Sequence, residues 1–179
     1  TVQDPAKTLV FSLPDLLDVE PLTKGLQVPI TLTGFDESGS FQVALLWDPE
    51  VVKLVGFDPQ SIPALNEEDQ LLDSQLTGIT LFEDSNTPGR AMISWTSPDQ
   101  TDISLPDGSE IVLLFDVIGT AGDVSSLTFD QTSSAVTSFS DTAPTLEFID
   151  GTLSVKIGGY PKLELVGEAE LTIEAGIAY

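Results

Sequence analysis

The sequence predicts an all-β fold, a β-sandwich of about nine strands, from three observations. Short runs rich in Val, Ile, Leu and Phe alternate between apolar and polar residues, as half-buried strands do. Turn signals built from Gly, Pro, Asp and Asn separate these runs about every 8–12 residues. Helical periodicity is almost absent, because only residues 66–73 fit one or two helical turns. A β-barrel is the alternative architecture.

The predicted strands follow one another along residues 8–155. Pro14 interrupts the first strand, which predicts an edge position or a bend. Asp48-Pro49 ends the central strand, because proline lacks an amide donor and the Asp48 side chain can close an Asx turn. In the acidic segment 66–73, Asn66 is the expected N-cap of a short helix. The strand candidates are residues 8–13, 16–23 (short or irregular), 26–35, 41–47, 51–57, 78–82, 91–96, 110–118, 125–130, 146–149 and 152–155, with 131–139 as a weak strand or flap.

Residues 158–179 form a separate segment after the predicted sandwich of residues 1–157. Gly158-Gly159 is a linker signal, and two alternating runs follow it around a turn at Gly167. We expect this segment to be an added hairpin or the truncated start of a second domain. Pairing with an edge of its own sandwich or of a neighbouring chain would order it, so the tail is a candidate for self-association.

The chain is strongly acidic, with 29 Asp and Glu against 6 Lys and Arg and a net charge of −23. Such a surface repels the phosphates of nucleic acids and anionic membranes. No apolar run approaches the roughly 18 residues of a membrane helix, and the first residues lack the basic and apolar regions of a signal peptide. We therefore expect neither nucleic-acid binding nor membrane insertion. The acidity fits a saline environment, abundant divalent cation or simple solubility.

Histidine and cysteine are both absent, which excludes disulfides, zinc sites and Ser-His or Cys-His catalysis. A hydrolase would need a pair of carboxylates, and no pair stands out among the many acids. We therefore expect no enzymatic activity and no cofactor.

Calcium is the one metal that the acidic loops could hold. Residues 84–89 match three positions of an EF-hand loop, but Pro88 occupies a ligand position and Trp95 the twelfth, so this segment is interpreted as a turn. Calcium at residues 36–37, 67–69 or 99–107 is an alternative to solvated acidic loops.

The stretch from Phe41 to Phe57, FQVALLWDPEVVKLVGF, resembles the aromatic-Asp-Pro corner and the following Val/Leu-rich strand of the cohesin family, with Trp47 at the aromatic position. Residues 110–119 resemble the family's long strand, and residues 150–155 (DGTLSV) are similar to its closing strand. Cohesins are receptor modules of cellulosome scaffolds and of other surface proteins. The resemblance implies a jelly-roll-like sandwich and a non-catalytic extracellular or cell-surface module. Its partner would be a dockerin that brings its own calcium.

The tail resembles a different family. Residues 161–176 are similar to the opening of bacterial immunoglobulin-like surface repeats, which begin with a proline, an alternating strand, a glycine and a Thr-Ile-Glu-x-Gly run. This resemblance implies a modular surface protein.

The partner-binding surface is predicted from the register of the strands at 41–47, 91–96 and 110–118, which the resemblance places on the dockerin-receiving sheet. Phe41, Val43, Leu45 and Trp47 occupy the inward register of the first strand, and the alternate residues point outward. An outward set that is nearly free of acids and contains several apolar side chains favours an interface. The predicted partner-binding residues are Gln42, Ala44, Leu46, Met92, Ser94, Val112, Leu114 and Asp116.

Two other functions compete with this interpretation. A structural spacer or adhesin sandwich without a dockerin partner fits the charge and the tail equally well. A carbohydrate-binding module would need Trp47 or Trp95 at the surface, although both lie in the apolar register of their strands. The flap near residues 132–139, or the tail, could also cover the predicted face.

Overall fold

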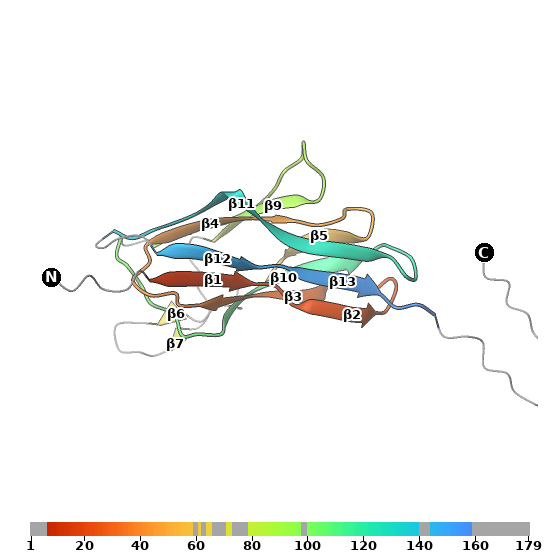
Figure 1. The fold of residues 1–179 in the computed structure, drawn as a ribbon, viewed down its shortest axis with the longest axis horizontal. Coiled ribbons are helices and arrows are strands. Elements are labelled where there is room, and N and C mark those ends of the chain that lie inside the picture. The colour runs from red at the N-terminus through yellow and green to blue at the C-terminus, as the bar shows by residue number, and fades with distance from the viewer. Residues whose placement is uncertain are drawn as a thin grey trace, which may run out of the picture.

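The computed structural model describes residues 7–58, 61, 64–65, 71–72, 79–97, 100–139 and 144–158. The described chain is all β, and two sheets face each other as a sandwich (Figure 1). One sheet has five strands in the order β12-β1-β3-β10-β5, and the other has six in the order β2-β13-β11-β4-β9-β8. The strands are β1 (Thr8–Ser12), β2 (Asp15–Val19), β3 (Leu26–Thr33), β4 (Ser40–Leu46), β5 (Val52–Phe57), β6 (Ala64–Leu65), β7 (Leu71–Leu72), β8 (Thr80–Glu83), β9 (Arg90–Thr96), β10 (Ser109–Val117), β11 (Val124–Thr137), β12 (Thr145–Ile149) and β13 (Gly151–Val155).

The predicted sandwich is confirmed, and the part of the chain that the structure describes places eleven strands in its two sheets where about nine were expected. Two strands lie where the strand signals in the sequence are weak. β2 is a regular strand in the stretch expected to be short or irregular, and β11 continues through the Ser/Thr-rich segment as far as Thr137.

The predicted helix over residues 66–73 is wrong where the structure describes it, because Leu71–Leu72 forms β7 and pairs with Ala64–Leu65. Cross-strand pairing of these apolar residues overrides the local capping signal at Asn66. Residues 66–70 and 73 lie outside the described residues, as does the tail from residue 159 onward.

Two of the crossings between the sheets, from β1 to β2 and from β12 to β13, lie at neighbouring positions and tie the two sheets together. Pro14 separates β1 from β2, as its predicted bend requires, and the turn before Gly151 separates β12 from β13. The two crossings run side by side, since β1 pairs with β12 and β2 with β13, both in parallel. A Cβ on Gly151 would lie 2.2 Å from the Pro14 carbonyl oxygen, so only glycine allows this close approach.

The core fills the space between the sheets with the inward residues of both. Phe11 lies at its centre, fully buried, 5.6 Å from the ring of Phe41 and 5.9 Å from that of Phe148. The predicted inward register of β4 is confirmed, because Phe41, Val43 and Leu45 are all buried. At the end of this strand the Glu50 amide donates to the Asp48 carboxylate at 2.9 Å, which is the predicted Asx turn.

Candidate interaction surface

The outer surface over β11, β4, β9 and β8, here called the β4 face, is built by four neighbouring antiparallel strands. One row across it runs from Phe82 through Met92 and Ala44 to Asp130. The next row runs from Arg90 through Leu46 to Thr128. Because side chains on one face of neighbouring strands stand side by side, these rows form one surface.

The eight predicted partner-binding residues do not share one face. Gln42, Ala44, Leu46, Met92 and Ser94 come from β4 and β9 and lie together on the β4 face. Val112, Leu114 and Asp116 come from β10, which pairs with β3 and β5 in the five-stranded sheet. They point away from the core on the opposite side of the sandwich, on the outer surface over β12, β1, β3, β10 and β5, here called the β10 face.

This corrects the expectation of a single sheet. The alternation along each strand distinguishes inward from outward residues correctly, but it carries no information on which sheet a strand joins. Long-range pairing decides that, and here β10 pairs with strands from both sides of β4 in the sequence.

The flap predicted near residues 132–139 does cover part of the β4 face. β11 shifts register between Asp130 and Ala135, and the intervening residues lie over β4. The Ser134 hydroxyl accepts the Ala44 amide at 3.2 Å, and the Gln42 side-chain amide donates to the Ser133 carbonyl at 3.2 Å. Ala44 is consequently fully buried although it points outward, so it cannot contact a partner.

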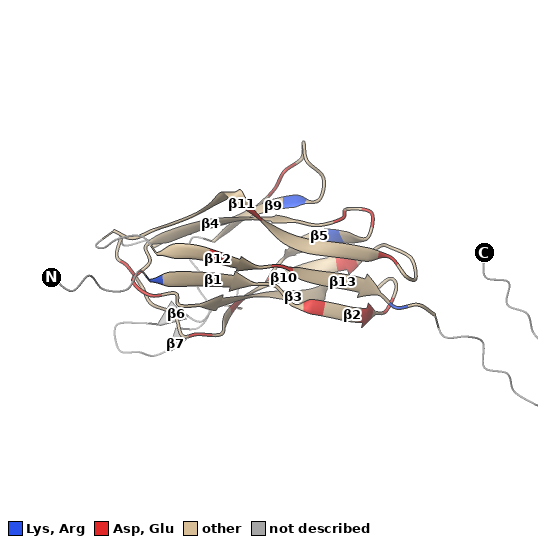
Figure 2. Cartoon of the chain, in the orientation of Figure 1, with Lys and Arg blue, Asp and Glu red and all other residues tan. Residues whose placement is uncertain are grey.

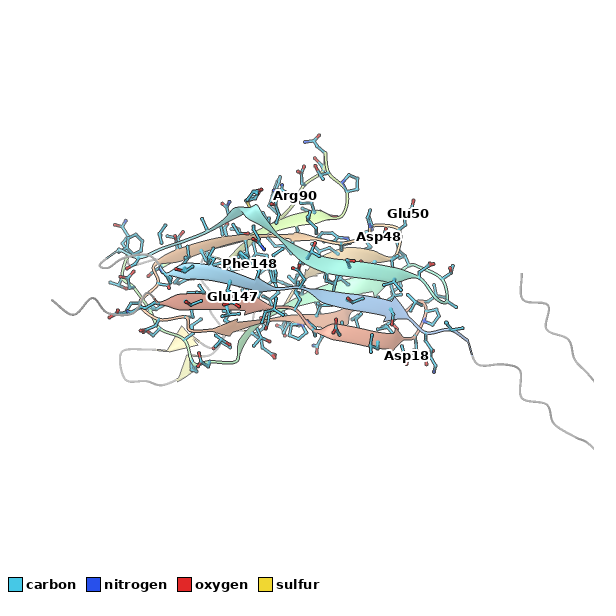
Figure 3. The ribbon with its side chains drawn as sticks, in the orientation of Figure 1. Asp18, Asp48, Glu50, Arg90, Glu147 and Phe148 are labelled. Atoms are coloured by element: carbon cyan, nitrogen blue, oxygen red, sulfur yellow. The ribbon has the colours of Figure 1, made fainter. Side chains whose placement is uncertain are left out.

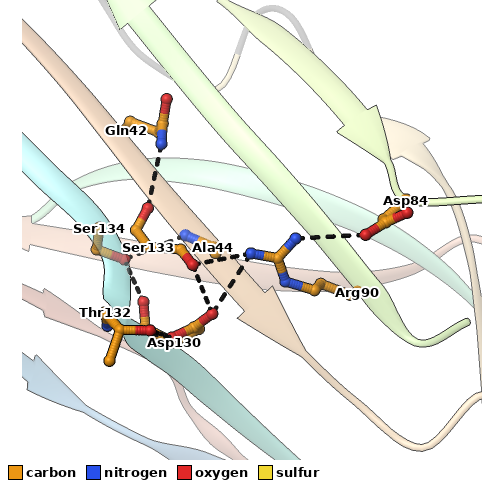
Figure 4. A network of polar contacts seen from close by, with 8 residues as sticks. All are labelled: Gln42, Ala44, Asp84, Arg90, Asp130, Thr132, Ser133 and Ser134. Carbon is orange, nitrogen blue, oxygen red and sulfur yellow. Dashed lines mark hydrogen bonds and ion pairs between the residues drawn. The ribbon is translucent and has the colours of Figure 1, made fainter. Parts of the chain in front are cut away.

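Arg90 fixes this bulge to the sheet (Figure 4). One of its Nη atoms donates to the Ser133 hydroxyl at 2.9 Å and approaches Asp130 to 3.4 Å, while the other approaches Asp84 to 3.4 Å. Asp130 also accepts the Thr132 hydroxyl at 2.6 Å and the Ser133 hydroxyl at 2.7 Å. The hydroxyl donors of Thr132 and Ser133 lower the pKa of Asp130 to about 2.

Asp84 begins the turn between β8 and β9. Its carboxylate accepts the Asn86 amide at 2.9 Å, and this backbone donor is the main reason that the pKa of Asp84 is lowered. The carboxylate therefore closes its own turn and binds Arg90, as expected for a turn rather than an EF-hand loop. Among the described residues, no group of three or more acids is arranged to hold a metal ion.

Sequence reasoning missed three residues of this surface: Phe82, Arg90 and Asp130. Phe82 is 65% exposed, beside Met92. Arg90 was detectable, since it is the only cation between Lys53 and Lys156 in a very acidic chain. Asp130 had no signal, because its place on the face depends on pairing between β11 and β4.

The two tryptophans belong to the core. Trp47 is 7% exposed, and its ring meets that of Phe115 edge-on at 5.3 Å. Trp95 is 5% exposed and stacks on Phe41 at 5.9 Å. The carbohydrate-binding alternative rested on an exposed tryptophan at one of these positions, and neither provides one.

Charge is distributed unevenly over the surface (Figure 2). Strands β4 and β9 carry only one charged residue, Arg90, and acids gather in the turns around them. Asp48 and Glu50 follow β4 at one end of the sandwich, where Figure 3 shows both side chains. A shallow hollow of about 410 Å³ lies beside them, lined by Leu46, Trp47, Asp48, Val124, Ser126 and Thr128. The two central strands of the β4 face thus carry no acid and a single cation, Arg90, and acids border them.

Within the described residues, no helix is long and apolar enough to cross a membrane.

No protein-family model matches the sequence, and no curated protein matches it. Solved structures do match. The seventh ScaB type I cohesin from Pseudobacteroides cellulosolvens is 15% identical, with a TM-score of 0.66 over 88% of this chain and 98% of that one. The third ScaC cohesin from Acetivibrio cellulolyticus, solved in complex with the ScaB dockerin, is 19% identical, with a TM-score of 0.63 over 83% of this chain and 99% of that one.

An archaeal structure matches as well. The non-cellulosomal cohesin from Archaeoglobus fulgidus is 14% identical, with a TM-score of 0.57 over 83% of this chain and 91% of that one. The matched proteins thus include both cellulosomal and non-cellulosomal modules. The sandwich described here has the cohesin fold.

Proposed function

We propose that this chain is a non-catalytic interaction module that receives a dockerin-like partner on its β4 face. The solved cohesins of the same fold from Acetivibrio cellulolyticus and Clostridium thermocellum are recorded in complex with dockerins. The observation that carries the proposal is that the two central strands of the β4 face carry no acid, and only Arg90 as a charged residue, on a chain with a net charge of −23. Desolvating such a centre costs little, whereas burying unpaired acids would be expensive.

The contact residues follow from exposure on this face. Phe82 and Met92 are adjacent and provide an aromatic and a thioether side chain, two groups enriched at interface cores. Leu46 extends the apolar surface toward the hollow beside Asp48. Ser94 and Gln42, in the next row, offer hydrogen bonds. Val112, Leu114 and Asp116 are outside the proposed site, because they lie on the β10 face.

The bulge of β11 shapes the proposed site. It stands over Ala44, so a partner would contact the hydroxyls of Thr132 and Ser133 rather than β4 itself at this point. The partner would bring any calcium that the complex needs, and the module would contribute no cofactor. We further propose an extracellular or cell-surface location within a modular protein.

Isothermal titration calorimetry against dockerin modules encoded in the same genome, with and without calcium, tests this function. We expect saturable binding to at least one dockerin, in the micromolar range or tighter, and no binding to it after calcium is chelated. If the folded protein binds none of these dockerins, the structural spacer becomes the better explanation.

A further inference from the structure

The hollow of about 410 Å³ lies at one end of the β4 face, where β4 ends and β11 begins. Leu46 and Val124 give it apolar walls, and Val124 is 55% exposed. Asp48, Ser126 and Thr128 add oxygen atoms to the same lining. Because Thr128 stands opposite Leu46 in the ladder, the hollow is continuous with the surface that receives the proposed partner.

Asp48 is held in a fixed position by the backbone around it. Its amide donates to the buried Ser125 hydroxyl at 2.9 Å. Its carbonyl accepts the amides of Val51 and Val52, both at 3.1 Å. One of its carboxylate oxygens accepts the Glu50 amide at 2.9 Å. A carboxylate fixed in this way gives up little conformational freedom when it binds a ligand, so this part of the hollow is preorganised.

The polar atoms of the hollow are free to bind something else. Within the described residues, the second carboxylate oxygen of Asp48 and the hydroxyls of Ser126 and Thr128 have no hydrogen-bond partner. The described chain also forms no salt bridge to Asp48. Its ion pairs join other acids and are made by Lys7, Lys24, Arg90 and Lys156.

We propose that this hollow is a subsite for a lysine or arginine side chain of the docked partner, with the aliphatic stem on Leu46 and Val124 and the cationic head on Asp48. The inference rests on the proposed function, because the partner supplies the side chain. A long basic side chain suits both halves of the hollow, since its methylene groups cover apolar surface while its head makes charge-assisted hydrogen bonds. The hydroxyls of Ser126 and Thr128 accept its remaining N–H donors.

Other kinds of side chain suit the hollow less well. An apolar side chain would remove water from the Asp48 carboxylate without replacing its hydrogen bonds, which opposes binding. An acidic side chain would approach Asp48 on a chain with a net charge of −23. The hollow therefore selects partners that carry a basic residue at the margin of an apolar contact surface.

Calorimetry with the variant Asp48→Asn tests the subsite, with the dockerins of the same genome as probes. Asparagine keeps a side-chain oxygen that can accept the Glu50 amide, so the variant removes the charge and preserves the turn. We expect the dissociation constant of a bound dockerin to rise about tenfold in 50 mM NaCl. In 0.5 M NaCl the rise should fall below about threefold, because salt screens an ion pair at the margin of an interface.

Glu50→Gln is the matched control. It removes the same charge two residues along the chain, from a side chain that does not line the hollow. The dissociation constant of this variant should stay within about twofold of that of the unaltered protein at both salt concentrations.

A double-mutant cycle then identifies the basic side chain. Each lysine and arginine of the bound dockerin is replaced in turn by methionine, which keeps an unbranched stem and removes the charge. One replacement should weaken binding about tenfold to the unaltered protein and less than about twofold to Asp48→Asn.

Two results would overturn the subsite and leave the proposed function standing: a dockerin that binds Asp48→Asn as tightly as the unaltered protein, or one in which no replacement is coupled to Asp48. If the unaltered protein binds none of the dockerins, the proposed function and the subsite are both wrong.

Discussion

The β4 face and the β10 face are the outer surfaces of the two sheets, and each exposes alternate residues of apolar central strands. They differ in their charges. On the β10 face, Asp116 accepts the Lys24 ammonium at 2.9 Å and the Gly25 amide at 3.0 Å, and it stands opposite Lys53 in the ladder. On the β4 face, β4 and β9 carry only Arg90, whose charge is matched by Asp84 and Asp130.

The faces also differ in what the chain itself places on them. On β10, Val112 donates its amide to the Ser61 hydroxyl at 3.0 Å and accepts the Asp58 amide at 2.8 Å, so residues after β5 already pair along this strand. On the β4 face the chain covers only Ala44 and its surroundings, and Phe82 stays largely exposed. Hydrophobic alternation is similar on both faces, so charge and coverage distinguish the candidate docking surface from the other.

Paired substitutions of two leucines test this difference most strongly. Leu46→Asp should weaken dockerin binding at least about 100-fold, because it places a carboxylate in the apolar centre of the β4 face and desolvation of that charge opposes docking. Leu114→Asp, on the β10 face, should leave the dissociation constant within about twofold. Calorimetry measures both, and circular dichroism checks that each variant folds. Equal losses in the two variants would contradict the assignment of the face.

A second pair of substitutions tests the coverage of the β4 face by the bulge of β11. Ala44→Leu should lower the free energy of unfolding by about 1–3 kcal/mol, since the added bulk must displace Ser133 and Ser134. Val112→Leu, at a half-buried outward position on the β10 face, should change it by less than about 0.5 kcal/mol. Urea unfolding gives both values. A neutral Ala44→Leu variant would show that the bulge does not rest on β4.

Local chemistry predicts a large part of this fold. The alternation of Phe41, Val43 and Leu45 sets the inward register of β4, and the chemistry of Asp48-Pro49 sets the turn that ends the strand. These features depend on neighbouring residues, so they are visible in the sequence. The pairing of Leu71–Leu72 with Ala64–Leu65 was missed, because a capping signal pointed to a helix there.

The candidate site was only partly predictable for a physical reason. The placement of β10 in the other sheet depends on contacts with β3 and β5, which are distant in sequence. The burial of Ala44 depends on a register shift in β11, more than eighty residues later. Neither the sheet to which β10 belongs nor the burial of Ala44 changes the alternation of apolar and polar residues within its own strand. Val112 and Leu114 are therefore indistinguishable from Leu46 until the strand pairing is known.

The single cation of the β4 face should matter more for stability than an ion pair of the β10 face. Arg90→Gln should lower the thermal unfolding midpoint by about 2–4 °C, because it removes donors to Ser133, Asp130 and Asp84 from a half-buried network. Lys24→Gln, whose side chain is 68% exposed, should lower it by less than about 2 °C. Differential scanning calorimetry at pH 7 compares them. If the unfolding midpoint of Arg90→Gln is no lower than that of Lys24→Gln, Arg90 does not stabilise the protein by fixing the bulge of β11 to the sheet.

The smallest expected effect concerns one carboxyl group on each face, because the pKa values of Asp130 and Asp116 are lowered by different causes. The pKa of Asp130 is lowered to about 2 mainly by hydroxyl donors, whereas that of Asp116 is lowered mainly by the Lys24 side chain. A lowered folded-state pKa stabilises the protein above the ordinary carboxyl range, and this contribution is lost as the pH falls toward the folded value. For Asp130 the loss should therefore extend from about pH 4 down to about pH 2.

Salt screens the exposed ammonium but not the hydroxyl donors. In 1 M NaCl, carboxyl-carbon NMR titration should find Asp130 still near 2 and Asp116 closer to its ordinary value of 3.8. A rise of the Asp130 pKa as large as that of Asp116 would mean that Arg90, rather than Thr132 and Ser133, sets its ionisation.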